Sequence, residues 1–304
     1  MHTTQQPSST VSKVWNQWQQ ARNLNPSQYV DWGDHPTILA LLYGEMFGSP
    51  STSIFDYLKQ AYPNFVNSSV LSLCAGDGAF EKLLLKQGVF GTITGIDLAE
   101  ERVGTANAQI AEFEGRLNFI VGDVNKGDFG VALYDVVFAK AALHHVEQLE
   151  SMFAGIKKCL KPGGKLVTVD FFGPTRFQWS DAQLDAVNHF IDTAIPDTLL
   201  KRADGSRHHN INRPTIEAMI AMDPSEAVRS SDIDHLIRQH FSQIREFQIG
   251  GALLSLIFDP TVVNNFDCSN PQHNEIIHAA FHYERRLMAE NKIGSDFKFI
   301  VAQA

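Results

Sequence analysis

A buried strand, a glycine turn and the start of a helix follow one another between residues 70 and 85. The apolar side chains of Val70, Leu71 and Leu73 predict a strand of a parallel sheet, and Gly76 and Gly78 allow the backbone after it to turn tightly against a ligand. The helix that follows would direct its free N-terminal amides at that ligand. The segment therefore predicts a cradle for a small molecule, although phosphate, dinucleotide and nucleoside cofactors all use such a unit.

Two further predicted strands are each followed by a carboxylate. The strand over residues 91–97 ends at Asp97, about twenty residues past the glycine turn, where the carboxylate would accept two hydrogen bonds from a ribose diol. A third strand over residues 117–121 is followed by Asp123, at a place suited to read the amino group of an adenine. The two carboxylates favour a nucleoside as the ligand.

The blocks that follow are more specific. A fourth strand over residues 134–139 precedes the segment Leu-His-His-Val at 143–146, and the turn Leu-Lys-Pro-Gly-Gly-Lys at 160–165 leads into a fifth strand over residues 166–171. With these blocks in this order behind the glycine turn, residues 70–175 resemble the class I S-adenosylmethionine-dependent methyltransferases. The family often has an acidic residue at the position of Ser72 and a glycine at the position of Cys74.

The resemblance implies a fold, a cofactor and a set of binding residues. The fold is α/β, with a Rossmann-like, doubly wound seven-stranded sheet whose last strand is antiparallel and lies next to strand five. An N-terminal helical cap and a helical lid inserted after strand five complete it. The cofactor is S-adenosyl-L-methionine, and the residues expected to bind it are Cys74, Ala75, Gly76, Gly78, Asp97, Leu98, Asp123, Val124, Ala139 and Lys140.

Additions surround this core, and we divide the chain into four parts. These are an N-terminal helical cap (1–66), the cofactor-binding core (67–175), a helical lid or substrate insertion (176–242), and a C-terminal part that completes the sheet (243–304). In the cap, Pro36 predicts the start of a helix. Four aromatic residues of the cap either fold over the cofactor or pack the helices onto the core: Trp15, Trp18, Tyr29 and Trp32.

The lid and the C-terminal part have their own periodic patterns. Apolar spacing in the lid predicts three helices, over residues 181–191, 214–222 and 233–241. The C-terminal part is expected to contain a strand, a helix and a last strand, over residues 243–258, 271–288 and 297–302 respectively.

Two histidine pairs are candidates for the chemistry. His144 and His145 follow the fourth strand at the carboxyl edge of the sheet, so they are the candidate catalytic residues, with one imidazole acting as a general base for a protonated acceptor. The alternative is that this pair packs or caps a helix. His208 and His209, in a polar loop of the lid, either reach into a substrate cleft or lie on the surface.

The charge, the cysteine and histidine spacing and the absence of long apolar stretches indicate which partners, metals and locations to expect. The formal net charge of −9 opposes binding to a phosphate backbone, so we expect no nucleic-acid partner. Cys74, Cys159 and Cys268 lack metal-type spacing and suggest a reducing compartment. His278 and His282 have the spacing of zinc ligands, but nothing completes a ligand set, so we expect a solvated helix face and no metal. With no apolar h-region near residue 1 and no apolar stretch approaching ~20 residues, a cytoplasmic protein without a membrane span is expected.

These observations predict an S-adenosylmethionine-dependent methyltransferase that moves a methyl group to an oxygen, nitrogen or carbon atom of a small-molecule metabolite, such as a natural product, a sugar or a lipid-type acceptor. The alternative is a protein that binds S-adenosylmethionine without transferring its methyl group, in another reaction or in regulation. The departures at Ser72 and Cys74 favour that alternative. An NAD-dependent oxidoreductase is disfavoured, because Glu81 stands where its fingerprint needs glycine. The oligomeric state stays open.

Overall fold

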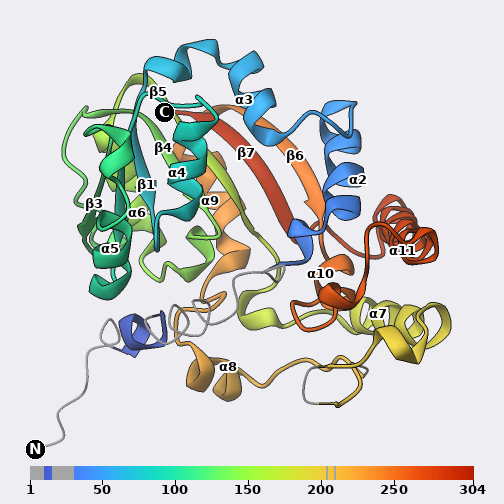
Figure 1. Cartoon of the computed structure of the whole chain (residues 1–304). Helices are drawn as coiled ribbons and strands as arrows, with labels where there is room; N and C mark the ends of the chain where they lie inside the picture. The colour runs from blue at the N-terminus through green and yellow to red at the C-terminus, as the bar shows by residue number, and fades with distance from the viewer. Residues whose placement is uncertain (1–9, 16–30, 203–204, 209) are drawn as a thin grey trace, which may run out of the picture.

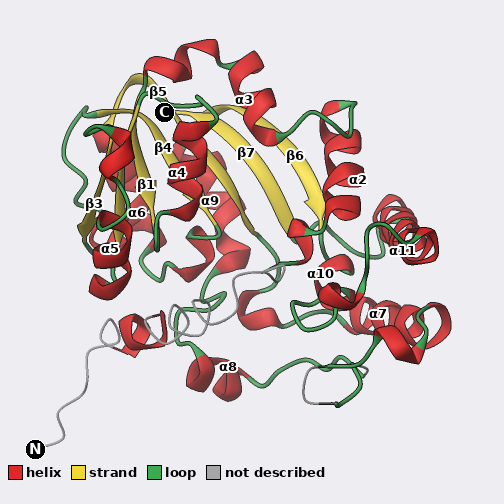
Figure 2. Ribbon diagram, in the orientation of Figure 1, coloured by secondary structure: helices red, strands yellow, loops and turns green. Residues whose placement is uncertain are grey.

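A sheet of seven strands organises the molecule (Figure 2). The computed structural model describes residues 10–15, 31–202, 205–208 and 210–304. The strand order is β3-β2-β1-β4-β5-β7-β6, and β7 runs antiparallel to both of its neighbours while the other strands are parallel to one another. The predicted fold class is confirmed. The strands are β1 (Ser69–Leu73), β2 (Thr92–Asp97), β3 (Leu117–Val121), β4 (Tyr134–Lys140), β5 (Leu160–Phe171), β6 (Ser242–Gly250) and β7 (Phe297–Gln303).

Helices cover both faces of this sheet (Figure 1). Within the described ranges, no helix combines the length and the apolar character needed to cross a bilayer. The α-helices are α2 (Pro36–Phe47), α3 (Ile54–Ala61), α4 (Ala79–Lys86), α5 (Glu100–Asn107), α6 (Leu149–Cys159), α7 (Asp181–Ala194), α8 (Ile216–Met222), α9 (Ile233–His240), α10 (Leu254–Ile257) and α11 (Pro271–Ala289).

Strand β4 explains why the sheet needs helices on both sides. Val136 and Phe138 belong to one core cluster, whereas Val137 and Ala139 belong to another. Because side chains alternate along a strand, these clusters lie on opposite faces of the sheet. Side chains of α6 and α9 complete one cluster, and side chains of α2, α4, α7 and α11 contribute to the other. Burial of both faces is what a parallel sheet requires, and it accounts for the unbroken apolar runs in the sequence.

The parallel strands end at a common edge, and this edge positions the site. In Figure 1, α7, α8 and α10 lie beyond the end of the sheet where β1 and β4 finish. Open α/β sheets hold their ligands at the carboxyl ends of the strands. The insertion after β5 therefore lies at the edge of the sheet where a ligand is expected.

Most predicted elements agree with the structure, and one strand does not. Helix α2 begins at Pro36, as predicted, with His35 as its N-cap. The strand predicted over residues 243–258 is wrong beyond Gly250, because Gly250 and Gly251 adopt φ values of 85° and 77° and the chain then enters α10. Trp32 is buried and packs against Phe297, and it also lines the cavity described below, so both alternatives stay open for that residue.

Two further predictions are not tested by the structure. Trp18 and Tyr29 lie outside the described residues. The division of the chain into four parts stays a prediction.

A buried carboxylate anchors the turn between β6 and α10. The backbone N–H groups of Gly251, Leu253 and Leu254 donate to the carboxylate of Glu284 at 2.6–3.0 Å, and the Glu284 side chain is fully buried on α11. Helix α10 in turn lines the candidate site through its residues 255 and 256.

We expect Glu284→Ala to lower the free energy of unfolding by about 3 kcal/mol, because it leaves three buried N–H groups without an acceptor. Urea denaturation followed by circular dichroism measures this loss. Glu290→Ala is the control, because Glu290 is exposed and directly follows α11. It should change the free energy of unfolding by less than about 0.5 kcal/mol. Equal stability of the two variants would mean that α10 is held by packing alone.

Candidate active site

A cavity of about 1400 Å³ opens at the carboxyl edge of β1, β2 and β4. Its wall is built from the glycine turn after β1, the ends of β2 and β3, and the segment after β4. Residues 224–226 and part of α10 close it from the other side, together with residues 11 and 15 from the N-terminal helical segment. Segments far apart in the sequence thus meet around one space large enough for a nucleoside cofactor and an acceptor.

The glycine turn is held to the end of β2 by Asp97. The backbone N–H of Gly76 donates to Oδ2 of Asp97 at 2.8 Å, and that of Ala99 donates to Oδ1 at 2.9 Å. Gly76 and Gly78 have φ values of 60° and 70°, and a Cβ at Gly78 would lie 2.2 Å from the ring of Phe119. Both glycines are therefore required by the turn.

Cys74 occupies a conformation that favours glycine. Its φ is 50°, in the left-handed region, at the position where the resembling family often has glycine. Burial raises the pKa of its thiol, and the nearby Asp97 raises it further. The thiol is thus a neutral part of the cavity wall and no nucleophile.

The residues predicted to bind the cofactor gather in one place. Gly76 and Gly78 form the backbone of the turn, whereas Ala139 is fully buried within β4 and does not line the cavity. For all ten, direct contact with the cofactor stays a prediction. The remaining predicted residues line the cavity: Cys74, Ala75, Asp97, Leu98, Asp123, Val124 and Lys140.

Two buried polar atoms in the cavity wall fit a ligand with charges of both signs. Oε2 of Glu81 and Nε of Arg102 have no hydrogen-bond partner in the part of the chain that the structure describes. Both residues line the cavity. Buried polar atoms are normally paired, so one unpaired carboxylate oxygen and one unpaired guanidinium nitrogen in the same wall suggest that a ligand completes them. The amino-acid end of S-adenosylmethionine, which carries an ammonium and a carboxylate, has the required chemistry.

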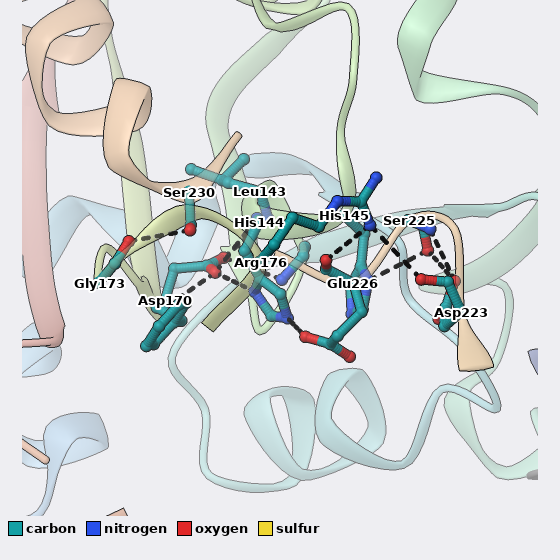
Figure 3. Close-up of polar contacts among 12 residues, drawn as sticks. Leu143, His144, His145, Asp170, Gly173, Arg176, Asp223, Ser225, Glu226 and Ser230 are labelled. Carbon is teal, nitrogen blue, oxygen red and sulfur yellow. Dashed lines mark hydrogen bonds and ion pairs between the residues drawn. The ribbon is translucent and has the colours of Figure 1, made fainter. Parts of the chain in front are cut away.

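His144 is held by a buried carboxylate from the neighbouring strand (Figure 3). Nδ1 of His144 lies 2.5 Å from Oδ1 of Asp170, and the N–H groups of Ala142 and Leu143 donate to Oδ2 of Asp170 at 2.8 Å. Because the carboxylate can only accept, Nδ1 carries the proton of the pair. Nε2 is left to accept a proton, and it lies 3.5 Å from Oε1 of Glu226.

The two candidate histidines have opposite electrostatics. Burial lowers the pKa of His144, but the carboxylates of Asp170 and Glu226 outweigh it, so the pKa lies above the usual value. Burial lowers the pKa of His145 well below its usual value, and the charge of His144 lowers it further. The Nδ1 of His145 lies 3.2 Å from Oγ of Ser225. His144 is therefore the imidazole suited to take up a proton, and His145 is a neutral hydrogen-bonding group beside it.

The chain is similar to known methyltransferases in sequence and in fold. Residues 71–168 match the family described as "Methyltransferase domain". Over 135 residues the chain is 32% identical to the polyketide synthase component of compactin nonaketide synthase from Penicillium citrinum, an alignment that covers 42% of this chain and 4% of the synthase. Over 110 residues it is 30% identical to an uncharacterized methyltransferase of Synechocystis sp., which covers 36% of this chain and 49% of that protein. In fold it is similar to phosphoethanolamine N-methyltransferase 2 of Haemonchus contortus, with a TM-score of 0.50 and 16% identity over 92% of this chain and 59% of that one.

Residues 71–168 form a methyltransferase domain. The predicted family resemblance is confirmed, and so is S-adenosylmethionine as the cofactor of this domain. The chain spans less than half the length of either curated relative.

Three residues that hold or contact the candidate histidines or their neighbouring loop were not predicted from the sequence. Asp170 is a lone carboxylate in an apolar strand, and that signal was available. Glu226 and Arg176 gave none, because they lie in short segments without a periodic pattern, Glu226 between α8 and α9 and Arg176 just after β5. The guanidinium of Arg176 donates to the backbone carbonyls of Pro224 and Glu226 at 2.7 and 2.9 Å, which holds the loop that carries Ser225 and Glu226 (Figure 3).

His208, His278 and His282 do not line this cavity. His208 is buried, with Nε2 2.9 Å from the carbonyl oxygen of Leu256 and Nδ1 3.1 Å from Asp259, so the expectation that it reaches a substrate cleft or the surface is wrong. It ties the lid loop to α10 instead. His209 lies outside the described residues, and His278 and His282 are exposed on α11.

We expect Glu226→Gln to lower the pKa of His144, because it removes a negative charge 3.5 Å from Nε2 that favours the protonated imidazole. An NMR titration of the histidine ring resonances measures the shift. Glu217→Gln, at an exposed position on α8, is the matched control and should leave the His144 pKa unchanged. An unchanged pKa in Glu226→Gln would assign the whole upward shift to Asp170.

Proposed function

We propose that this chain is an S-adenosylmethionine-dependent methyltransferase that acts on a small molecule whose acceptor atom must lose a proton, with His144 as the general base. The observation that carries this proposal is the buried His144–Asp170 pair, whose imidazole lines the cavity. A methyl acceptor with a free electron pair needs only alignment with the methyl group, so a buried, oriented imidazole favours an acceptor that needs a base.

The residues of the chain have separate tasks in this reaction. The cofactor supplies an electrophilic methyl group. Nε2 of His144 would take the proton of the acceptor, which would free the acceptor's electron pair for the methyl group that bound S-adenosylmethionine supplies, with S-adenosylhomocysteine as the leaving product. The imidazolium that results is stabilised by Asp170, which also fixes the ring, and by Glu226. Apolar side chains of Phe171, Phe177 and Trp179 line the same cavity and would exclude water from the acceptor.

The acceptor class we favour is a carbon activated by neighbouring carbonyl groups, or the hydroxyl of its enol or phenol form. An imidazole is a base of moderate strength, so the acceptor must be more acidic than an ordinary alcohol. The similarity to a polyketide synthase component supports this class, since polyketide intermediates carry such carbons. A cytoplasmic location and a substrate other than nucleic acid stay predictions from charge and cysteine content.

The test is a labelled-methyl transfer assay on the full chain with three acceptors, a β-keto thioester, a phenol and a primary amine. We expect transfer to the β-keto thioester or the phenol. His144→Ala should then lower kcat by about 10²- to 10⁴-fold while its affinity for S-adenosylhomocysteine stays within about twofold. His278→Ala, on the exposed face of α11, is the control and should keep the full rate.

Two outcomes would contradict the proposal. A full rate in His144→Ala would remove the base, and cofactor binding without transfer to any acceptor would favour the protein that uses S-adenosylmethionine in another way. One potential ligand atom from each of His144, His145 and Glu226 lies within 4.8 Å of the others, so these three side chains could hold a metal ion. The assay is therefore run with and without EDTA.

A further inference from the structure

Glu81 is a buried carboxylate with one free oxygen at the wall of the cofactor cavity. It lies in the first turn of α4 and is only 4% exposed. The hydroxyl of Ser72 on β1 donates to Oε1 at 2.7 Å, whereas Oε2 has no partner within the described ranges. The reaction proposed above does not use this group.

A carboxylate in this position is costly unless a cation meets it. Burial raises the pKa of Glu81 to about 7, and the hydrogen bond from Ser72 opposes that shift only in part. Of the charged groups that face it, Asp77 in the glycine turn raises the pKa and Lys140 at the end of β4 lowers it. Lys140 is exposed, and its ammonium group lies over the ring of Phe80. Without a further positive charge, Glu81 is close to the balance between its neutral and charged forms.

The contact between Ser72 and Glu81 also bears on the altered motif of this chain. The resembling family often has its acidic residue at the position of Ser72, on the strand. Here the strand carries the hydroxyl and α4 carries the carboxylate, and the two side chains touch. The chain therefore keeps a carboxylate at this corner of the cavity but supplies it from the helix, where the partial positive charge of the helix N-terminus favours it.

We propose that Glu81 binds the α-ammonium group of S-adenosylmethionine, in place of an acidic residue at position 72. This inference rests on the proposed cofactor site but not on His144 or on the identity of the acceptor. The ammonium meets the free Oε2, while Ser72 holds the other carboxylate oxygen and so fixes the orientation of the group.

Three ligands separate this assignment from the alternatives. S-adenosylmethionine carries an ammonium and a sulfonium, S-adenosylhomocysteine carries only the ammonium, and 5′-methylthioadenosine carries neither. By isothermal calorimetry, Glu81→Gln should weaken the binding of the first two by about 10- to 100-fold and leave the third within about twofold. Glu101→Gln, at an exposed position on α5, is the matched control and should bind all three as the wild type does.

A swap variant tests the pairing itself. Ser72→Glu combined with Glu81→Ser returns the carboxylate to the strand and the hydroxyl to the helix, and it should bind S-adenosylhomocysteine more tightly than Glu81→Gln by about tenfold. Thermal unfolding checks that each variant is folded. The wild-type affinity should also rise from about pH 6 to about pH 8, as Glu81 becomes charged, and this dependence should be absent in Glu81→Gln.

Three results overturn the assignment. They are wild-type affinity of Glu81→Gln for S-adenosylhomocysteine, an equal loss for 5′-methylthioadenosine, or a loss confined to S-adenosylmethionine, which would assign Glu81 to the sulfonium. If the wild-type chain binds none of the three ligands, the proposed function itself fails, and that result is distinct from a failure of Glu81 alone.

Discussion

The carboxylate of Asp170 joins the two strands on which the candidate chemistry depends. It accepts hydrogen bonds from the backbone of Ala142 and Leu143 and holds Nδ1 of His144, all while being 1% exposed. A buried carboxylate whose oxygens all accept hydrogen bonds has one low-energy arrangement. The segment after β4 and the imidazole are therefore oriented together. The position of the candidate base is therefore set by β5. The cofactor cradle is set by β1 and β2, and the pairing of β4 with β1 and β5 fixes the separation of the two sites.

The cofactor end of the cavity uses its carboxylates in two different ways. Asp97 is committed to the fold, because each of its oxygens already accepts a backbone N–H from the turn or from the start of α5. Each oxygen still has a second lone pair, so ribose hydroxyls would add to these bonds without breaking them. Glu81 is committed only through one oxygen, to Ser72. Asp97 thus holds the turn whether or not a ligand is bound, whereas Glu81 has one oxygen available to a positively charged group of a ligand.

The sequence predicted best what is local along the chain. Gly76, Gly78 and Asp97 belong to one strand, turn and strand unit, in which a φ requirement and a strand end fix the places of the residues. His144 was also located correctly, but its role depends on Asp170, which becomes its neighbour only through the pairing of β4 with β5. His208 was misinterpreted because a polar loop is usually solvated, whereas here Asp259 and a backbone carbonyl satisfy a buried imidazole.

The acceptor side of the cavity was beyond the reach of sequence periodicity, and its construction explains why. Arg176 adopts a left-handed φ of 55° and donates its hydrogen bonds to backbone carbonyls of residues 224 and 226, not to their side chains. The hydrogen bonds from Arg176 therefore do not depend on which side chains the loop carries, although the Asp223 side chain also accepts hydrogen bonds from Ser225 within the loop. The side chains of Ser225 and Glu226, in contrast, contact the two histidines, so a substitution at either position would also act on the candidate base. The loop backbone is thus held by Arg176, separately from Asp170 and the glycine turn, whereas the side chains at 225 and 226 are coupled to the candidate base.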